Sequence, residues 1–176
     1  MDGEQLRSIQ APLKARYRAE SAAALITLHA EGELGSEEIS CSVQTGRALV
    51  EAGLHPGSGG DGSFACSGDM LLQALVACAG VTLRAVAINR GIALTGRVRA
   101  EGDLDFRGTM GVDPRAPVGF AAIRLTFELE SNASPEDLDA LLATTERYCV
   151  VLQTLTRPPD LSVSRQATNG SGRIRL

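Results

Sequence analysis

The sequence predicts an α+β protein, because its strands come in groups rather than in alternation with its helices. Period-two alternation of apolar and polar residues, typical of strands with one buried face, occurs over residues 26–54 and again over 97–130. Between the two groups, residues 67–90 have the apolar content of a buried helix. Another helix begins near Ser134, so the predicted order is helix, three strands, helix, two strands, helix and a final strand.

The first half of the chain is expected to hold a helical extension, residues 1–24, followed by a meander of three strands. Within the extension, residues 4–18 are interpreted as a short helix. The meander strands are expected at residues 26–33, 39–44 and 48–54. The glycine-rich segment at residues 55–63 has no lysine, so it lacks the Gly-Lys-Ser/Thr ending of a phosphate-binding P-loop. We interpret it as a flexible connection to the next helix.

The central helix is predicted to begin with Ser67 as its N-cap and to stop at Gly91, because serine favours N-caps and glycine favours helix ends. Between them, apolar residues occur on every face of the helix, which predicts burial on all sides. The longest uncharged apolar run, from Met70 to Leu83, has 14 residues. A membrane-spanning helix needs roughly 20, so we expect a core helix and no membrane partner.

The second half is predicted to hold two long strands, a helix start and a final strand. The strands are expected at residues 97–105 and 122–130, where apolar and charged residues alternate. The sequence SPED at 134–137 is typical of a helix start, with an N-cap, a proline at the first helical position and acids near the positive end of the helix dipole. Cys149 follows in a second helical piece, and residues 161–163 form the last strand.

Composition and charge exclude several classes of function. The 17 basic and 21 acidic residues give a net charge of −4, which argues against a nucleic-acid protein that binds phosphates through a basic face. Four Phe, two Tyr and no Trp leave little for a base-stacking surface. The start of the chain lacks the apolar run of a secretory signal, so we expect a cytoplasmic protein whose four cysteines are thiols.

Few residues could carry chemistry. The cysteines stand at positions 41, 66, 78 and 149, too widely spaced for the paired ligands of a zinc site. His29 falls on the polar side of its strand, and no Gly-x-Ser-x-Gly motif supports a serine hydrolase. Judged by its helical neighbours alone, Cys78 is a buried thiol with a raised pKa, and Cys149 gives no different indication. The residues by themselves favour inert packing thiols and leave a chemical role open.

Four segments of the chain occur in a recognisable order. They are GDMLLQALVACAGVTLRAVAINRGI, EGDLDFRG, PVGFAAIRLTFELESNASPEDLDALL and ERYCVVLQTL, which start at residues 68, 101, 117 and 146. Together they resemble the central helix and second half of the OsmC/Ohr family, the osmotically inducible and organic-hydroperoxide-resistance proteins. The resemblance implies an OsmC-like domain over residues 25–165, with residues 166–176 as a flexible tail. It also implies antiparallel sheets wrapped around the long central helices of an intertwined homodimer.

The resemblance implies a chemistry as well. Family members reduce organic hydroperoxides with two cysteines, which correspond here to Cys78 on the central helix and Cys149 on the later helix. The expected cycle forms a sulfenic acid and then a disulfide, which an external dithiol or lipoyl-type reductant opens. No cofactor and no metal are expected. In the family, an arginine lowers the pKa of the attacking cysteine and a glutamate orients it; the candidates here are Arg47 and Asp69.

A second hypothesis comes from a different class of protein. The chain could be a non-catalytic small-molecule binding protein that keeps the same scaffold and an incidental pair of thiols. The two hypotheses differ in thiol chemistry, because only a peroxidase loses two thiols on exposure to a hydroperoxide and regains them with a dithiol.

Overall fold

The computed structural model describes residues 3–34, 41–43, 52–63, 65–167 and 170–175. The α-helices in these ranges are α1 (Gly3–Ala19), α2 (Ser67–Arg90), α3 (Phe106–Thr109), α4 (Pro135–Tyr148) and α5 (Val150–Thr156). The strands are β1 (Leu25–Leu34), β2 (Cys41–Val43), β3 (Ala52–Gly53), β4 (Ala65–Cys66), β5 (Leu94–Asp105), β6 (Phe120–Ser131), β7 (Ser162–Ala167) and β8 (Gly170–Arg175). Two 3-10 turns are η1 (Ser21–Ala24) and η2 (Pro56–Ser58). This arrangement confirms the predicted α+β class.

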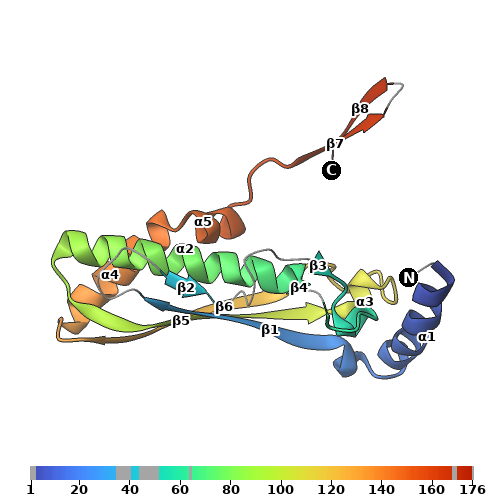
Figure 1. Ribbon diagram of the computed structural model, residues 1–176, viewed down its shortest axis with the longest axis horizontal. Coiled ribbons are helices and arrows are strands. Elements are labelled where there is room, and N and C mark those ends of the chain that lie inside the picture. Colours follow the sequence, from blue (N-terminus) through green and yellow to red (C-terminus); the bar gives the residue numbers. More distant parts are fainter. Residues whose placement is uncertain (1–2, 35–40, 44–51, 64, 168–169, 176) are drawn as a thin grey trace.

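A four-stranded antiparallel sheet, with the order β2-β1-β5-β6, forms one layer of the molecule, and α2 runs along one of its faces (Figure 1). β1 pairs with β5 from Leu25 opposite Asp105 to Glu33 opposite Arg97. β5 also pairs with β6, from Leu94 to Leu104. The two groups of strands predicted from the sequence therefore join in a single sheet.

The predicted meander is wrong in its third strand. Of residues 48–54 the structure describes 52–54, and there β3 pairs in parallel with β4 instead of joining the sheet. Gly53 lies opposite Cys66, so the pair brings the residues just before the glycine-rich segment beside the start of α2. Period-two alternation indicates an extended strand but does not identify its partner, which is why the sequence pattern did not reveal this pairing.

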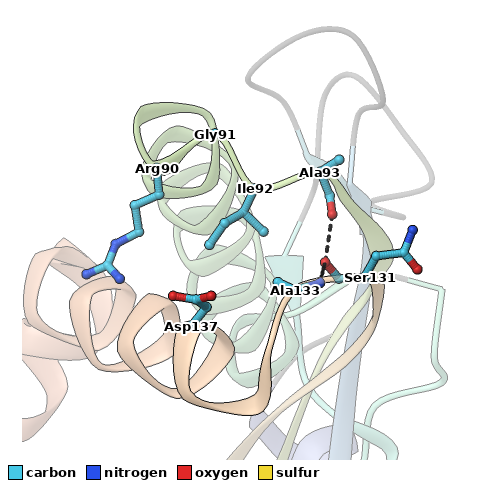
Figure 2. Close-up of a pocket in the computed structure, with 8 residues that line it drawn as sticks. Arg90, Gly91, Ile92, Ala93, Ser131, Ala133 and Asp137 are labelled. Carbon is cyan, nitrogen blue, oxygen red and sulfur yellow. Dashed lines mark hydrogen bonds between the residues drawn. The ribbon is translucent and has the colours of Figure 1, made fainter.

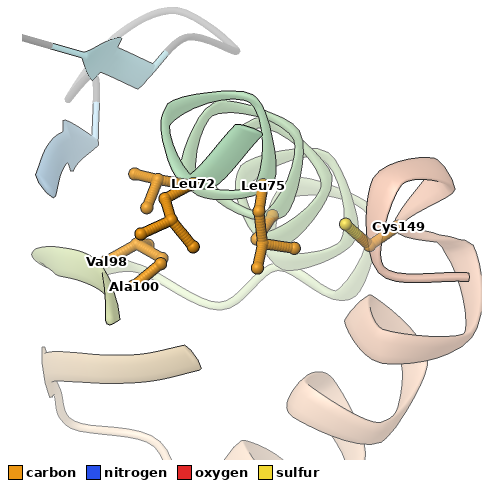
Figure 3. Close-up of a cluster of buried hydrophobic side chains, with 7 residues drawn as sticks. Leu72, Leu75, Val98, Ala100 and Cys149 are labelled. Carbon is orange, nitrogen blue, oxygen red and sulfur yellow. The ribbon is translucent and has the colours of Figure 1, made fainter. Parts of the chain in front are cut away.

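The main core lies between α2 and the sheet. Leu72, Leu75 and Val76 of α2 are fully buried and cluster with Val98 and Ala100, the inward-facing residues of β5 (Figure 3). Fully burying one such aliphatic side chain contributes about 1.5–3 kcal/mol relative to leaving it exposed. The alternating pattern of β5 therefore determines which side of the sheet faces the helix. It also determines which face of α2 points toward the sheet.

The ends of α2 lie close to their predicted positions. The N-cap is Cys66, one residue earlier than the predicted Ser67, and its side chain makes no capping hydrogen bond. Gly91 ends the helix as predicted, with a φ of 67° that places it in the left-handed region favoured by glycine. Its N–H donates to the carbonyl groups of Ala87 and Ile88.

One face of α2 is not covered within the single chain. Met70, Val81 and Ile88 are 36%, 39% and 48% exposed, so the predicted burial on all sides is not reached by one copy. By length and apolar composition α2 could cross a membrane, but eight of its residues are buried against the rest of the chain. That burial is the arrangement of a core helix with one apolar face left open.

The helix start predicted at Ser134 is confirmed. The Oγ atom of Ser134 accepts a hydrogen bond from the N–H of Asp137 at 3.1 Å, and Pro135 occupies the first helical position. At the other end of α4, Cys149 adopts an extended conformation, with φ of −71° and ψ of 105°. Cys149 is thus both the C-cap of α4 and the N-cap of α5. This bend turns α5 so that it packs beside α2 (Figure 1).

The N-terminal extension is part of the folded body. The hydroxyl of Tyr17 on α1 donates to the carbonyl of Gly57 at 2.6 Å, and Tyr17 clusters with Phe106 and Met110. The neighbouring His55 accepts a hydrogen bond from the N–H of Gly57 through Nδ1 at 2.9 Å. The imidazole therefore caps the η2 turn and stacks on Phe106, with ring centroids 5.0 Å apart.

The C-terminal residues form a hairpin instead of a single short strand. β7 and β8 pair antiparallel from Ser162 opposite Arg175 to Ala167 opposite Gly170. The hairpin projects away from the sheet and α2 (Figure 1). The predicted last strand at 161–163 is therefore displaced by one residue and extended.

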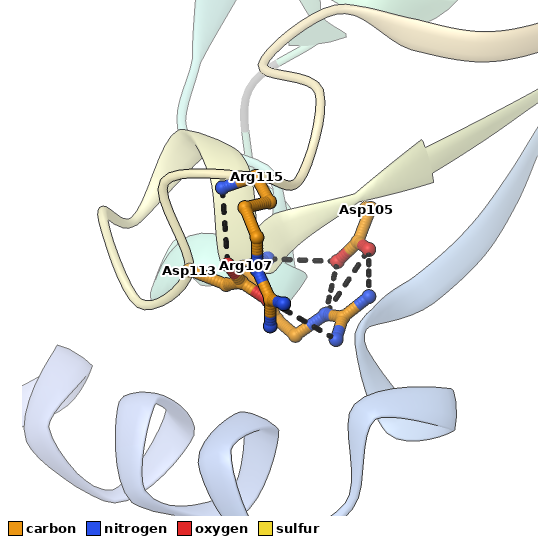
Figure 4. Close-up of polar contacts among 4 residues, drawn as sticks. All are labelled: Asp105, Arg107, Asp113 and Arg115. Atoms are coloured by element: carbon orange, nitrogen blue, oxygen red, sulfur yellow. Dashed lines mark hydrogen bonds and ion pairs between the residues drawn. The ribbon is translucent and has the colours of Figure 1, made fainter.

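A group of ion pairs fixes the turn that follows β5 (Figure 4). Asp105, which is 4% exposed, accepts hydrogen bonds from the backbone N–H and from the Nε atom of Arg107, both at 3.0 Å. Arg107 also lies 3.8 Å from Asp113, which in turn pairs with Arg115. The hydrogen bonds and charge of Arg107 hold the pKa of Asp105 below its ordinary value.

Asp105→Asn is expected to destabilise the protein by about 1–3 kcal/mol near pH 7, because the amide cannot accept the charge-assisted pair from Arg107. A carboxylate with a lowered pKa stabilises the fold above its unfolded pKa and loses that contribution as pH falls through the folded value. The difference in free energy of unfolding between variant and wild type should therefore shrink as the pH drops below 3.8, the ordinary pKa of an aspartate. Urea unfolding across acidic pH measures it, with Asp160→Asn, at an exposed position outside this group of ion pairs, as control. A pH-independent difference would contradict the assignment.

Candidate active site

The two cysteines singled out in the sequence lie together although 71 residues separate them. Cys78 is half-buried in the middle of α2, and Cys149 is fully buried at the bend between α4 and α5. The sulfur of Cys149 points toward α2 (Figure 3), and the two thiols share a hydrogen bond.

The thiol of Cys78 is surrounded by hydrogen-bond donors. Burial by itself raises the pKa of Cys78, but four donors lower it by more: the N–H of Val151, the thiol of Cys149, the N–H of Val150 and the hydroxyl of Thr82. The net pKa of Cys78 lies below its ordinary value. The raised pKa expected from its helical neighbours is therefore wrong, because the donors come from α5 and from the next turn of α2.

The thiol of Cys149 is shifted in the opposite direction. Burial, together with the hydrogen bond and charge of the neighbouring Cys78, raises the pKa of Cys149 to about 11. The two shifts are opposite in direction, so Cys78 loses its proton more readily than Cys149 does. The thiolate form is the nucleophile in thiol chemistry. The partly exposed sulfur of Cys78 is therefore the more reactive of the two, and the buried Cys149 beside it keeps its proton.

Of the two supporting residues expected from the resemblance, the structure describes Asp69 and does not bring it to the thiols. Arg47 lies outside the described residues. Asp69 is in the first turn of α2, nine residues before Cys78, which on a helix is about 13 Å away and on the opposite face. Arg84 is buried on the same helix, and its Nη1 lies 3.4 Å from the carbonyl oxygen of Leu94 at the start of β5. The donors around Cys78 are thus uncharged groups.

An apolar cavity of about 420 Å³ opens near the start of α2. Leu71 lines it, and Leu71 is seven residues before Cys78, which on a helix is the same face and about 10 Å away. Phe106, Phe120 and Leu104 line the other walls. An apolar group held there would lie two helical turns from the reactive sulfur.

A second cavity, of about 580 Å³, lies at the opposite end of α2 (Figure 2). Arg90 and Asp137 line it, and the hydroxyl of Ser131 donates to the carbonyl of Ala93 at 2.7 Å across its floor. Arg90 is twelve residues beyond Cys78, about 18 Å along the helix. This cavity is therefore too distant to take part in chemistry at the thiols.

The sequence reasoning missed three members of the site, Thr82 and the backbone N–H groups of Val150 and Val151. Thr82 had a visible signal, because a residue four positions after Cys78 lies on the same face of a helix. The N–H donors had none, since every residue except proline carries one and only the fold selects which of them meet a sulfur. Within the described ranges, no group of three or more His, Cys, Asp and Glu residues could hold a metal ion.

Val150→Pro tests the contribution of one N–H donor. Val150 is the first residue of α5, a position that accepts proline, and Cys149 before it has the extended backbone that a following proline requires. The substitution therefore removes the N–H without breaking the helix. We expect the pKa of Cys78 to rise and its alkylation by iodoacetamide at pH 7 to slow by roughly three- to tenfold. Val150→Ala keeps the N–H and is the control. Equal pH profiles for the two variants, measured by peptide mass spectrometry, would show that this donor is unimportant.

Comparisons with known proteins agree with this architecture. A family model described as OsmC-like protein matches residues 60–164. A solved structure described as an OsmC-like hydroperoxide resistance protein, from Jannaschia sp. CCS1, superposes with a TM-score of 0.57 at 16% sequence identity. The match covers 86% of this chain and 99% of that chain, and at this identity it concerns the fold alone. No curated protein sequence matches the chain.

Proposed function

The chain belongs to the OsmC-like protein family, and from this premise we propose that it is a thiol-dependent peroxidase that reduces organic hydroperoxides. The observation that carries the proposal is the unequal pair of thiols. Cys78 has a lowered pKa and is partly exposed, whereas Cys149 is buried, protonated and in hydrogen-bond contact with it. Shifted and unequal pKa values in adjacent groups are typical of functional sites.

The proposed cycle begins with the Cys78 thiolate attacking the distal oxygen of the hydroperoxide. The S–O bond forms, the O–O bond breaks, and the alkoxide leaves as an alcohol after taking a proton from water. Cys78 is now a sulfenic acid, oxidised by two electrons. The Cys149 sulfur then attacks the Cys78 sulfur, and the hydroxide that leaves takes the Cys149 proton to form water. An external dithiol, such as a lipoyl-type reductant, returns both thiols by exchange.

The surroundings support an organic substrate over hydrogen peroxide. The cavity lined by Leu71, Leu104 and Phe120 is apolar and lies two turns along α2 from Cys78. An alkyl or aromatic group gains free energy on entering such a space, and hydrogen peroxide has no such group. The need for an external dithiol also fits a reducing cytoplasm, where we place the protein.

We also propose that the working form is a homodimer in which a second copy covers the open face of α2. Met70, Val81 and Ile88 line that face, and a contact of this kind is expected to bury more than roughly 2,000 Å². Light scattering should therefore give about twice the chain mass of 18.4 kDa. Ile88→Asp should dissociate the dimer, whereas Val118→Asp, at a 69% exposed loop position, should not. A stable wild-type monomer at micromolar concentration contradicts the proposal.

The peroxidase function is tested by titration with cumene hydroperoxide. We expect the loss of two free thiols per equivalent of hydroperoxide, a new disulfide between the peptides that carry Cys78 and Cys149, and recovery of both thiols with a dithiol. Peptide mass spectrometry and thiol counting measure this. If the thiols persist in the presence of excess hydroperoxide, the chain is instead a non-catalytic binding protein on the same scaffold.

A further inference from the structure

The two cysteines differ in how a molecule from solution reaches them. Cys149 is fully buried and belongs to the main core cluster, together with Leu75 and Ala79 of α2 (Figure 3). Cys78 is half-buried and packs against this cluster from its edge. A disulfide between the two sulfur atoms would therefore have one sulfur inside the core and the other near the surface.

Cys78 lies beside an open part of α2. Ala74, one turn before Cys78 on the same face of the helix, and Leu71, two turns before it, are both exposed. Leu71 also lines the apolar cavity that we assign to the substrate. A small dithiol therefore approaches Cys78 from the same side as the hydroperoxide does.

Cys149 has no such approach. In thiol–disulfide exchange the attacking sulfur comes in line with the bond that breaks, from the side opposite the leaving sulfur, so access decides which sulfur is attacked. Around Cys149 the inner side of α4 is closed, because Thr145, one turn before it, and Leu141, one turn earlier still, are fully buried. An in-line attack on Cys149 would have to pass through this part of the core.

We propose that the external dithiol attacks the sulfur of Cys78, so that the mixed disulfide forms on Cys78 and Cys149 is the leaving thiol. The inference rests on the proposed function, in which the two cysteines form a disulfide. The bond from the dithiol to Cys78 forms, the Cys78–Cys149 bond breaks, and Cys149 takes the proton that the dithiol releases. The second thiol of the reductant then attacks the reductant's own bound sulfur and returns Cys78 as a thiolate. The dithiol is thereby oxidised by two electrons and the protein disulfide is reduced by two.

Leaving-group chemistry alone predicts the opposite product. A thiol with a lower pKa leaves faster, and the pKa of Cys78 is lowered whereas that of Cys149 is raised to about 11. With equal access to both sulfurs, attack on Cys149 with departure of Cys78 would be the faster route. The position of the mixed disulfide in the folded protein therefore separates control by access from control by the leaving group.

The test locates the mixed disulfide in the intact protein. Diamide forms the Cys78–Cys149 disulfide without any peroxide, and N-ethylmaleimide then blocks the remaining thiols. Glutathione, which has a single thiol and cannot complete the exchange within one molecule, is added, and iodoacetamide stops the reaction at short times. Peptide mass spectrometry identifies which cysteine carries glutathione and which carries the alkyl group. The matched control is the same oxidised protein in concentrated urea, where both sulfurs are exposed.

We expect glutathione on Cys78 and the alkyl group on Cys149 in the folded protein, and glutathione on both cysteines in urea. Glutathione on Cys149, or on both cysteines, in the folded protein would overturn the proposal. A disulfide that glutathione opens only in urea, or that diamide fails to form, would overturn it as well. Because no peroxide is used, glutathione on Cys78 in a protein inert to cumene hydroperoxide keeps this route of reduction and rejects the peroxidase.

Discussion

Cys78→Ser is expected to reduce the consumption of organic hydroperoxide to the rate of protein-free buffer. The attacking group must be ionised near neutral pH, and a serine hydroxyl is not, whereas the donors around Cys78 keep its thiol partly ionised. Because the attack is the first chemical step, even one equivalent of peroxide should survive. Hydroperoxide remaining after incubation with the reduced variant is the quantity to measure.

Cys66→Ser is the matched control for this loss. Cys66 is also half-buried and also belongs to the α2 region, as the N-cap, but it is twelve residues from Cys78 and so about 18 Å away. Its replacement should leave turnover unchanged. If Cys66→Ser abolished turnover and Cys78→Ser did not, the attacking residue would have been wrongly identified.

Cys149→Ser is expected to stop the cycle one step later and in a different state. The Cys78 thiolate should still consume one equivalent of hydroperoxide, because it forms the sulfenic acid without help from the second sulfur. The disulfide cannot then form, and the protein should stall. Dimedone should trap the sulfenic acid on the peptide that carries Cys78, and further peroxide should carry that sulfur to sulfinic acid.

The stoichiometry distinguishes this result from general damage. Wild type with a dithiol should turn over many equivalents, and the stalled variant should turn over one per chain. Steady turnover in Cys149→Ser would mean that the external dithiol reduces the sulfenic acid directly and that Cys149 has no part in the cycle. Failure to consume the first equivalent in a folded variant would mean that the buried thiol is needed to activate Cys78.

Local signals in the sequence were enough to predict the helices and strands that position the two cysteines. The end of α2 at Gly91 and the start of α4 at Ser134 follow from residues whose backbone and hydrogen-bonding preferences act over a few positions. The alternation that identified β5 and β6 also identified their buried faces, since side-chain direction in a strand depends only on parity.

Local signals could not predict which strands, or which cysteines, pair across long stretches of the chain. The partner of β3 and the union of the two strand groups through β1 and β5 depend on the closure of loops across the chain. The pairing of Cys78 with Cys149 came from the family resemblance and not from their spacing. The lowered pKa of Cys78 could not be foreseen from its helix, because the N–H groups that cause it belong to a segment more than 70 residues away.

The bend at Cys149 has a consequence for the lifetime of the fold. A bond from this residue to Cys78 would close a covalent ring of about 70 residues that contains β5, β6 and α4. On the chain-entropy description, such a ring removes conformations from the unfolded state and is worth roughly 4 kcal/mol. The oxidised form that awaits its reductant would then be harder to unfold than the reduced form. A shortage of dithiol would leave the protein inactive and, at the same time, in its most durable state.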